Sequence, residues 1–417
     1  MACDIATLLS SLNENLERTV KILKTEEAQR KLNEALHNHE KGALPDQDVS
    51  KLADISTDLL HEIQQMLNPG HLTLADHFLG YVPAKCLVGA VDLGIADKLQ
   101  EAGPMKISDL ADACSARPDR LHQVLRVLAC NGIFGYNATT KTFWNNHTST
   151  MLTKDHWTQW HQWVTLYGNQ FYDMARGIPE SLHKSATRTP AQIHYDTDLD
   201  VNAFFKQRGW FPQVHRALNA GADAQAPGIL ADYPWREVAR ETVVDVGGGG
   251  GAFLALLLRA HAGMRGGVVE LPHVVEHIRP FFRAPGGQYA DLAERVPEEN
   301  IVAGDFFESI PPATVYTIKW TLHNWKDDDA VRILRKVRSS LVQGPNSRLI
   351  VLESILDTTH SARLARHGDM NMMIAADGLE RTMDEWVSLA DRSGWVIDKV
   401  YPLRNAWPCA IDLRPKP

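Results

Sequence analysis

Five consecutive glycines, Gly247 to Gly251, stand in the stretch VVDVGGGGGAF, between an apolar segment and a second apolar segment with helical character. The backbone can approach a ligand closely there, because glycine has no Cβ and accepts positive φ in a turn. Nineteen residues after Gly251, Glu270 ends the next apolar segment in GGVVELPH. A carboxylate at this spacing can accept hydrogen bonds from both ribose hydroxyls of an adenosine cofactor. We therefore expect Gly247, Gly249 and Glu270 to bind such a cofactor.

Two cofactors fit the glycine turn and Glu270, and the residues at the end of a third apolar segment distinguish between them. A nicotinamide dinucleotide and S-adenosylmethionine both need a glycine turn and a ribose-binding acid. In AGDFF, Asp305 and Phe306 stand where a carboxylate and an aromatic ring could hold the amino group and ring edge of adenine. This pair suits an adenosine without a pyrophosphate, so the sequence favours S-adenosylmethionine.

One histidine, His323, stands in IKWTLHNWKDDD, after an apolar run that contains a single lysine, Lys319, and before a charged tail. The apolar run predicts a buried strand, and the charged tail predicts the start of a helix. These two elements would present the imidazole of His323 at the rim of a sheet.

Strand and helix patterns alternate along the C-terminal half. The expected strands are ETVVDVG, GGVVEL, ENIVAGDFF, ATVYTIKWTL and SRLIVLESIL, and the expected helices include AFLALLLRAH, VVEHIRPFF and DDDAVRILRKVRSSL. Such alternation predicts an α/β fold, a Rossmann-like, doubly wound parallel sheet with its ligand at the carboxyl ends of the strands. We assign this domain to residues 236–417.

Three helical regions are expected before this sheet. Residues 1–73 form an amphipathic helical arm, whose apolar stripe packs either on its own domain or on a second subunit. Residues 74–152 read as helices followed by a hairpin, a winged-helix arrangement that we expect to act in dimerisation or as a substrate lid rather than on DNA. Residues 153–235 are rich in Trp and His and form a helical lid or linker beside the substrate pocket.

Composition excludes several classes of protein. With 417 residues the chain is long enough for two domains. A net charge of −8 argues against a nucleic-acid partner. The five cysteines show no C-x-x-C spacing, so neither a zinc knuckle nor a disulfide framework is expected. We find no apolar run long enough to cross a membrane and no basic leader, so a cytoplasmic enzyme acting on a small molecule is expected.

The motifs VDVGGG, VELPHV, GDFF, KWTLHNW, LESIL and LERT follow one another in this order. In this order they resemble the S-adenosylmethionine-dependent O-methyltransferases of the plant caffeate and fungal secondary-metabolite type. The resemblance implies a class I methyltransferase domain, with residues from about 74 to 150 similar to the dimerisation domain of that family. It also implies a homodimer.

The resemblance carries over residue by residue. It implies that His323 is the general base, that Glu353 and Glu380 lie beside it, and that Lys319 lies near the adenosine end of the cofactor. The chemistry is consistent, because a phenol is largely protonated at neutral pH until a neutral imidazole takes its proton. Capping of a helix near Thr382 is the competing explanation for Glu380.

The acceptor pocket is the least defined part of the prediction. Trp160 and His161 in the Trp-rich segment, and Met370 and Met373 in GDMNMMIAADG, are the candidates for an apolar wall against a phenolic or enolic, polyketide-like substrate. No metal site is expected. Asn324 stands where the family usually has aspartate, which keeps open a relative that retains the cofactor as a fixed charge and catalyses dehydration or pericyclic ring closure.

Overall fold

The C-terminal half is built on a seven-stranded sheet with the order β11-β12-β8-β7-β4-β5-β6. The computed structural model describes residues 4–417 of the chain. The strands of this sheet are β4 (Thr242–Val246), β5 (Arg265–Glu270), β6 (Ile301–Ala303), β7 (Val315–Lys319), β8 (Arg348–Glu353), β11 (Trp395–Tyr401) and β12 (Cys409–Pro415). The first five run parallel, as expected. The sheet as a whole is mixed, because β12 pairs antiparallel with β8 and with β11.

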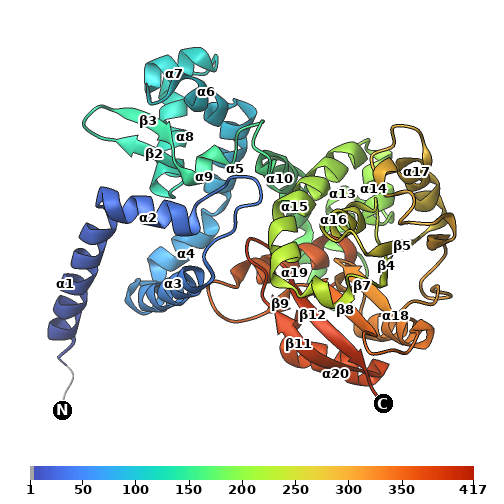
Figure 1. Ribbon diagram of the computed structural model, residues 1–417. Coiled ribbons are helices and arrows are strands. Elements are labelled where there is room, and N and C mark those ends of the chain that lie inside the picture. Colours follow the sequence, from blue (N-terminus) through green and yellow to red (C-terminus); the bar gives the residue numbers. More distant parts are fainter. Residues whose placement is uncertain (1–3) are drawn as a thin grey trace.

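Helices cover both faces of the sheet, so the doubly wound prediction is confirmed (Figure 1). On one face lie α16 (Ala252–Ala260) and α17 (Pro272–Arg283), and on the other lie α18 (Asp327–Ser340) and α20 (Met383–Ser393). The central strands β4, β7 and β8 are buried along nearly their whole length. This burial explains why they read as continuous apolar runs rather than as alternating ones.

The N-terminal part is helical apart from one small sheet. Its elements are α1 (Ile5–Leu23), α2 (Glu26–Leu36), α3 (Gln47–Leu67), α4 (Gly70–Phe78), α5 (Tyr81–Asp92), α6 (Ile95–Ala102), β1 (Met105–Lys106), α7 (Ile107–Ala113), α8 (Pro118–Cys130), β2 (Phe134–Asn137), β3 (Thr142–Asn145) and α9 (His147–Thr150). The expected hairpin is β2–β3, joined by β1. Helix α7 begins at Ile107, and Lys106 is its N-cap.

Between these parts lies a set of helices that includes α10 (Trp160–Leu166) and α15 (Phe211–Asp232). A π-helical turn over Tyr167–Phe171 follows α10 directly. After β8 the chain forms α19 (Arg363–Ala376), and the short strands β9 (Ile355–Leu356) and β10 (Arg381–Thr382) pair with each other.

None of the described helices is by itself long and apolar enough to cross a membrane. A bent pair, Gly70–Asp92 with Ile95–Ala102, meets the length and composition test only when its two helices are joined.

Candidate active site

The glycine turn joins β4 to α16 at the carboxyl edge of the sheet. Gly247, Gly249 and Gly251 all have positive φ, between 53° and 77°. At Gly249 an added Cβ would meet no atom within 4 Å, so the turn borders open space at this point. At Gly247, by contrast, a Cβ would lie 3.0 Å from Oγ1 of Thr321, which belongs to the loop after β7. The predicted cofactor turn and the His323 loop are therefore neighbours.

Glu270 ends β5, the strand beside β4, and its carboxylate lies against the glycine turn. The amide N–H of Gly249 donates to Oε1 at 3.0 Å, and that of Leu271 donates to Oε2 at 2.9 Å. Strand β6 lies beside β5, and the amide N–H of Gly304, directly after β6, donates to the carbonyl of Glu270. This bond brings Asp305 beside Glu270, with the carboxylate of Asp305 exposed. Four of the six predicted cofactor residues, Gly247, Gly249, Glu270 and Asp305, thus share one edge of the sheet.

His323 lies in the short loop after β7, with two carboxylates on one side of its ring. Its Nδ1 is 2.9 Å from Oε1 of Glu380 and 3.3 Å from Oε2 of Glu353. Carboxylates accept hydrogen bonds, so Nδ1 carries a hydrogen and donates a hydrogen bond to Glu380. Among residues 4–417, no protein group bonds to Nε2, which is the nitrogen left for an acceptor molecule. Only 11% of the His323 side chain is exposed.

Burial and the two carboxylates act in opposite directions on the imidazole. Burial lowers the pKa of His323, but the negative charges of Glu353 and Glu380 outweigh it and raise the pKa above its ordinary value. Burial raises the pKa of Glu353, and Glu380 adds to that rise, while His323 and the amides of Thr321 and Leu322 lower it. The site therefore favours an imidazolium once a proton reaches Nε2.

Residues 378–381 pack against the backbone of the His323 loop, a contact that the sequence analysis missed. At Gly378 an added Cβ would lie 2.1 Å from the carbonyl oxygen of His323, so only glycine fits. The amide of Leu379 donates to that same oxygen at 2.8 Å. Arg381, fully buried, donates to the carbonyls of Leu322 and Trp325 at 3.2 Å and 2.7 Å. The glycine of GLERT was the available signal for this close approach.

The capping explanation for Glu380 is wrong. The N-cap of α20 is Thr382, which forms a capping box with Glu385. The backbone of Glu380 is instead fixed by α19, since its amide N–H donates to Oδ1 of Asp369 at 2.8 Å. Its carboxylate is thereby directed to His323.

Trp320 and Lys319 connect β7 to this loop. Trp320 has a φ of 50°, a strained conformation for a bulky residue, directly before the loop that carries His323. The ammonium of Lys319 lies 4.3 Å from the centroid of the Trp320 indole. Burial lowers the pKa of Lys319, and the carboxylates of Asp245 and Glu353 oppose this effect. Lys319 thus lies between the cofactor edge and the His323 cluster.

Two of the residues predicted to contact the acceptor, Trp160 and Met373, lie in one cluster. An aromatic cluster is formed by Trp160, Trp163, Tyr167, Phe171, Trp320 and Trp407, with Met373 packed against it. The rings of Trp160 and Trp163 lie 5.4 Å apart. Met370 is 39% exposed on α19. The prediction for His161 is corrected, because its Nε2 bonds to the Gln162 side chain and the ring lies in the field of Asp97, on the winged-helix side.

Two other features of the described residues concern this site. The ligand atoms of His323, Glu353 and Glu380 lie within 4.8 Å of one another, close enough to hold a metal ion. Such an ion would displace the Nδ1 proton that Glu380 accepts. A hollow of about 730 Å³ lies instead at the N-terminal arm and is lined by none of these residues.

Comparison with known proteins identifies the family. Residues 213–396 match the O-methyltransferase domain, and residues 75–155 match the O-methyltransferase dimerisation domain. The chain belongs to the O-methyltransferases. It is 52% identical over 413 residues to O-methyltransferase aclM of Aspergillus oryzae, which covers 99% of this chain and 95% of that one. It is 43% identical to O-methyltransferase gliM of Aspergillus fumigatus, covering 98% and 94% of the two chains.

A solved structure agrees with this assignment. CalO1, a methyltransferase of calicheamicin biosynthesis in its S-adenosylhomocysteine-bound form, is 27% identical and gives a TM-score of 0.71 over 83% of this chain and 98% of that chain. The protein is thus an S-adenosylmethionine-dependent O-methyltransferase of the fungal secondary-metabolite group. The open glycine turn and the adjacent Glu270 carboxylate fit an adenosine cofactor.

Proposed function

We propose that this O-methyltransferase methylates a phenolic or enolic hydroxyl of a small aromatic or polyketide-like metabolite, with His323 as the general base. The observation that carries the proposal is the bond of 2.9 Å from Nδ1 of His323 to Glu380, which leaves Nε2 without a protein partner in the described chain. An imidazole oriented in this way is ready to accept a proton.

Different residues of this chain would bind the cofactor and accept the proton of the acceptor hydroxyl. Gly247, Gly249, Glu270 and Asp305 would hold the adenosyl part at the edge of the sheet. When bound, the cofactor supplies an electrophilic methyl group on a positively charged sulfur. Nε2 of His323 would take the proton of the acceptor hydroxyl as the hydroxyl oxygen bonds to the methyl carbon and the carbon–sulfur bond breaks, which leaves the neutral sulfide. General-base help of this kind contributes about 10²- to 10⁴-fold in rate.

The aromatic cluster supports the acceptor class. Rings of the size of tryptophan present a flat, apolar surface that suits a planar substrate. The relatives point the same way: one that is 32% identical over 349 residues is the mitomycin biosynthesis 6-O-methyltransferase of Streptomyces lavendulae. We therefore propose that Trp160 and Met373 contact the acceptor.

The test is a mass-shift screen of candidate metabolites with labelled S-adenosylmethionine. The wild type should add one methyl group to an acceptor oxygen, and His323→Ala should turn over at least about a hundredfold more slowly with the affinity for S-adenosylhomocysteine little changed. Activity should survive EDTA, because the proposal uses no metal ion. Near-wild-type turnover by His323→Ala would remove the imidazole from the mechanism.

The dehydration or pericyclic alternative gains no support from Asn324. Its side chain is exposed, so the charge that the family's aspartate would carry at this position is screened by solvent. Product formation with S-adenosylhomocysteine in place of S-adenosylmethionine would nevertheless favour that alternative, because no methyl group is then available.

A further inference from the structure

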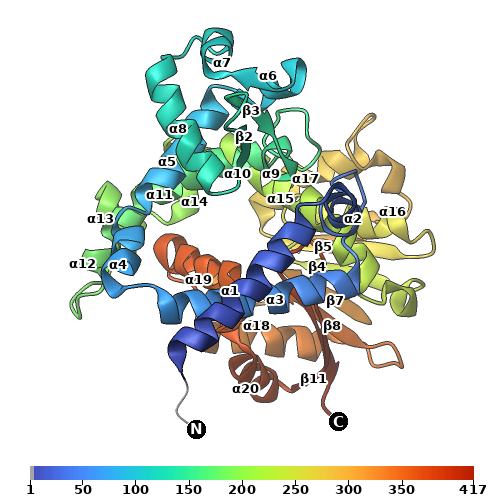
Figure 2. The ribbon, with the colours of Figure 1, turned by 90° about the vertical axis from the view of Figure 1, so that its left-hand side faces the viewer.

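The His323 cluster brings one imidazole and two carboxylates together from three separate segments. Strands β7 and β8 lie side by side, so the loop with His323 after β7 meets Glu353 at the end of β8 (Figure 2). Glu380 stands directly before β10. Nδ1 of His323 lies 2.9 Å from Oε1 of Glu380 and 3.3 Å from Oε2 of Glu353. Among residues 4–417, these three side chains are the one group of His, Cys, Asp or Glu whose ligand atoms lie close enough to hold a metal ion.

The hydrogen bonds of this cluster are incomplete. Nδ1 of His323 has one hydrogen, and Glu380 accepts the hydrogen bond that it makes. Oε2 of Glu353 faces the same nitrogen but has no hydrogen-bond partner in the described chain. Oε2 of Glu380 is also buried without a partner there. Both glutamates are more than nine-tenths buried, and a buried polar atom without a partner calls for an explanation.

The cluster also holds more negative than positive charge. A neutral imidazole does not balance two buried carboxylates, and burying a charge is costly unless it is paired. Lys319 is a nearby cation, but its ammonium acts on Asp245 as well as on Glu353. Burial and the charge of Glu380 raise the pKa of Glu353. A divalent cation between the two carboxylates would balance both charges.

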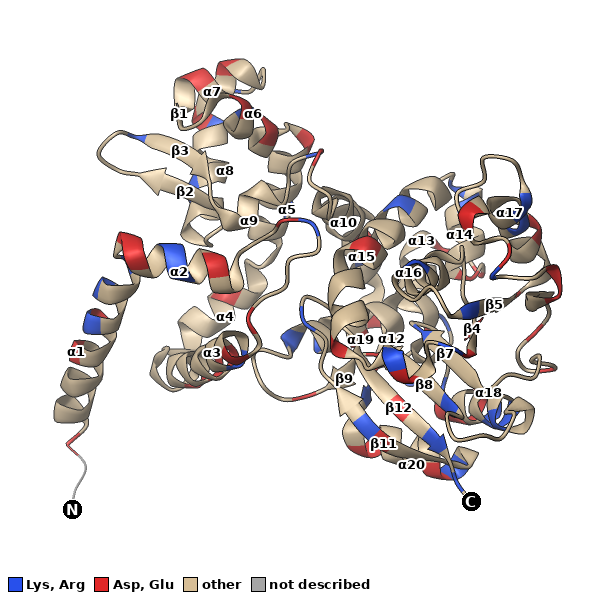
Figure 3. Cartoon of the chain, viewed as in Figure 1, with Lys and Arg blue, Asp and Glu red and all other residues tan. Residues whose placement is uncertain are grey.

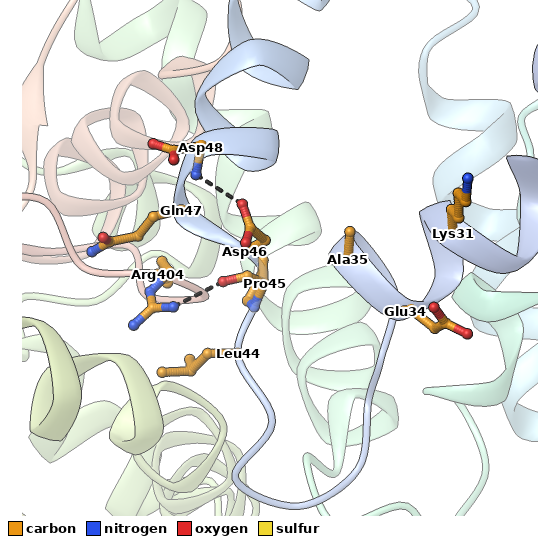
Figure 4. A pocket seen from close by; sticks show the side chains of 9 residues that line it. All are labelled: Lys31, Glu34, Ala35, Leu44, Pro45, Asp46, Gln47, Asp48 and Arg404. Atoms are coloured by element: carbon orange, nitrogen blue, oxygen red, sulfur yellow. Dashed lines mark hydrogen bonds between the residues drawn. The ribbon is translucent and has the colours of Figure 1, made fainter.

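The acidic residues of the N-terminal arm have a different environment. In Figure 3, acidic and basic residues alternate along α1 and α2. The hollow at the arm is lined by both kinds, since Lys31, Glu34, Asp46, Asp48 and Arg404 all border it (Figure 4). Its acidic residues are exposed, and the carboxylate of Asp46 is already engaged as the N-cap of α3. Buried carboxylates beside an imidazole are therefore specific to the His323 cluster in this comparison.

The donor atoms and their spacing suit zinc. Zn²⁺ binds imidazole nitrogen and carboxylate oxygen at about 2.0–2.2 Å, usually as a tetrahedron in which neighbouring ligands lie about 3.4 Å apart. The distances from Nδ1 to the two carboxylates therefore need to change by no more than about 0.5 Å. Mg²⁺ prefers an octahedron of oxygen ligands and fits this set less well. We propose that Zn²⁺, or a transition-metal ion of similar preference, binds to Nδ1 of His323, Oε2 of Glu353 and Oε1 of Glu380 and inhibits the enzyme.

The ion inhibits because it changes which ring nitrogen carries the hydrogen. A metal ion on Nδ1 takes the lone pair that held the hydrogen, so the proton leaves Nδ1 and the neutral imidazole carries its one hydrogen on Nε2 instead. In this form Nε2 donates a hydrogen bond and cannot accept the proton of the acceptor hydroxyl. The ion leaves the place beside Nε2 free, so kcat should fall while the KM for the acceptor changes little. This consequence rests on the function proposed above, whereas metal binding itself does not.

Binding is tested by isothermal titration calorimetry of the full-length, EDTA-treated protein with Zn²⁺ alone. The wild type should show a saturable site, and Glu353→Gln and Glu380→Gln should each bind at least about tenfold more weakly, because a neutral amide replaces a charged ligand. If one of these variants fails to fold, the other decides. The matched control is His147→Gln, which alters a histidine stacked with His37 at 3.9 Å outside the cluster and should bind as the wild type does. Absence of a zinc site, unchanged binding in the glutamine variants, or loss of binding in His147→Gln would overturn the proposal.

Inhibition is tested separately by methyl transfer in the presence of saturating Zn²⁺. The ion should lower kcat by about a hundredfold, as loss of the base would, and EDTA should restore it, whereas Mg²⁺ at the same concentration should have no effect. Unchanged turnover with zinc bound would overturn the inhibition. His323→Ala then shows whether the proposed function fails as well. A slow variant would leave His323 as the base and show only that the ion does not take Nδ1, and a fully active variant would remove both.

Discussion

Glu380→Gln is the sharpest test of the proposal that His323 acts as the general base. In the wild type, Nδ1 of His323 lies 2.9 Å from Oε1 of Glu380. The substitution keeps the size of the side chain and an oxygen that can accept this hydrogen bond. It removes only the negative charge. Because Glu380 is buried and takes no part in capping α20, the fold should be preserved.

The size of the effect follows from the bond that changes. A hydrogen bond with a charged partner contributes about 1.5–3 kcal/mol, against about 0.5–1.5 kcal/mol for a neutral one, so the imidazolium loses about 1–1.5 kcal/mol of stabilisation. That is roughly tenfold in the balance between imidazolium and neutral imidazole. The Glu380 charge contributes to the raised pKa of His323, so its removal should lower that pKa.

The assay is the pH dependence of kcat/KM. The proposed mechanism requires neutral His323, so in the wild type the acid limb should lie above the ordinary histidine value, where the raised pKa places it. In Glu380→Gln the limb should move to lower pH while the plateau falls, since a weaker base accepts the proton less well. Glu385→Gln, the same substitution in the capping box, is the matched control. A limb that stays in place, or moves to higher pH, would refute this account of the pair.

Three further predictions follow from single positions. Gly378→Ala places a Cβ 2.1 Å from the carbonyl oxygen of His323, so it should cost about 1–3 kcal/mol of stability and most of the activity, measured by thermal unfolding and turnover. Gly249→Ala should weaken S-adenosylhomocysteine binding in calorimetry, whereas Gly42→Ala, with a similar positive φ and equally open space, should not. Burial lowers the pKa of His39 to about 4, so the loop between α2 and α3 that carries His39 binds more protons when it detaches than when it is packed. The protection of this loop from hydrogen exchange should therefore be complete above pH 6.5 and be lost toward pH 4.

Much of the cofactor edge could be predicted from the sequence because parallel strands end at one edge of a sheet. The order of VDVGGG, VELPHV and GDFF along the chain therefore predicts that Gly249, Glu270 and Asp305 lie together, as the pairing of β4, β5 and β6 requires. The antiparallel strands β11 and β12 escaped this reasoning, since they follow the last alternation of strand and helix. Strand direction at the end of such a pattern depends on pairing that local sequence does not encode.

The acceptor side was harder to predict, because it depends on which way short helices turn. His161 and Trp160 are adjacent in sequence, yet only Trp160 joins the aromatic cluster, while His161 lies near Asp97. In a helix of seven residues followed by a π-turn, helical periodicity gives no reliable face. The contacts of Gly378 and Arg381 with the His323 loop were missed for a related reason, since their partners are backbone carbonyls, and Gly378 itself is the only sequence signal for them.

The two glutamates beside His323 are not equivalent, although the sequence presents them alike. Oε1 of Glu353 accepts the amides of Thr321 and Leu322, each at 2.8 Å, so this carboxylate shapes the loop that carries the base. Only its second oxygen faces the imidazole, at 3.3 Å, and Glu380 provides the shorter contact. Loss of charge at Glu353 should therefore lower the thermal stability of the loop as well as turnover, whereas at Glu380 it should act on the proton alone. Glu353 thus shapes the loop that carries His323, and Glu380 tunes the imidazole itself.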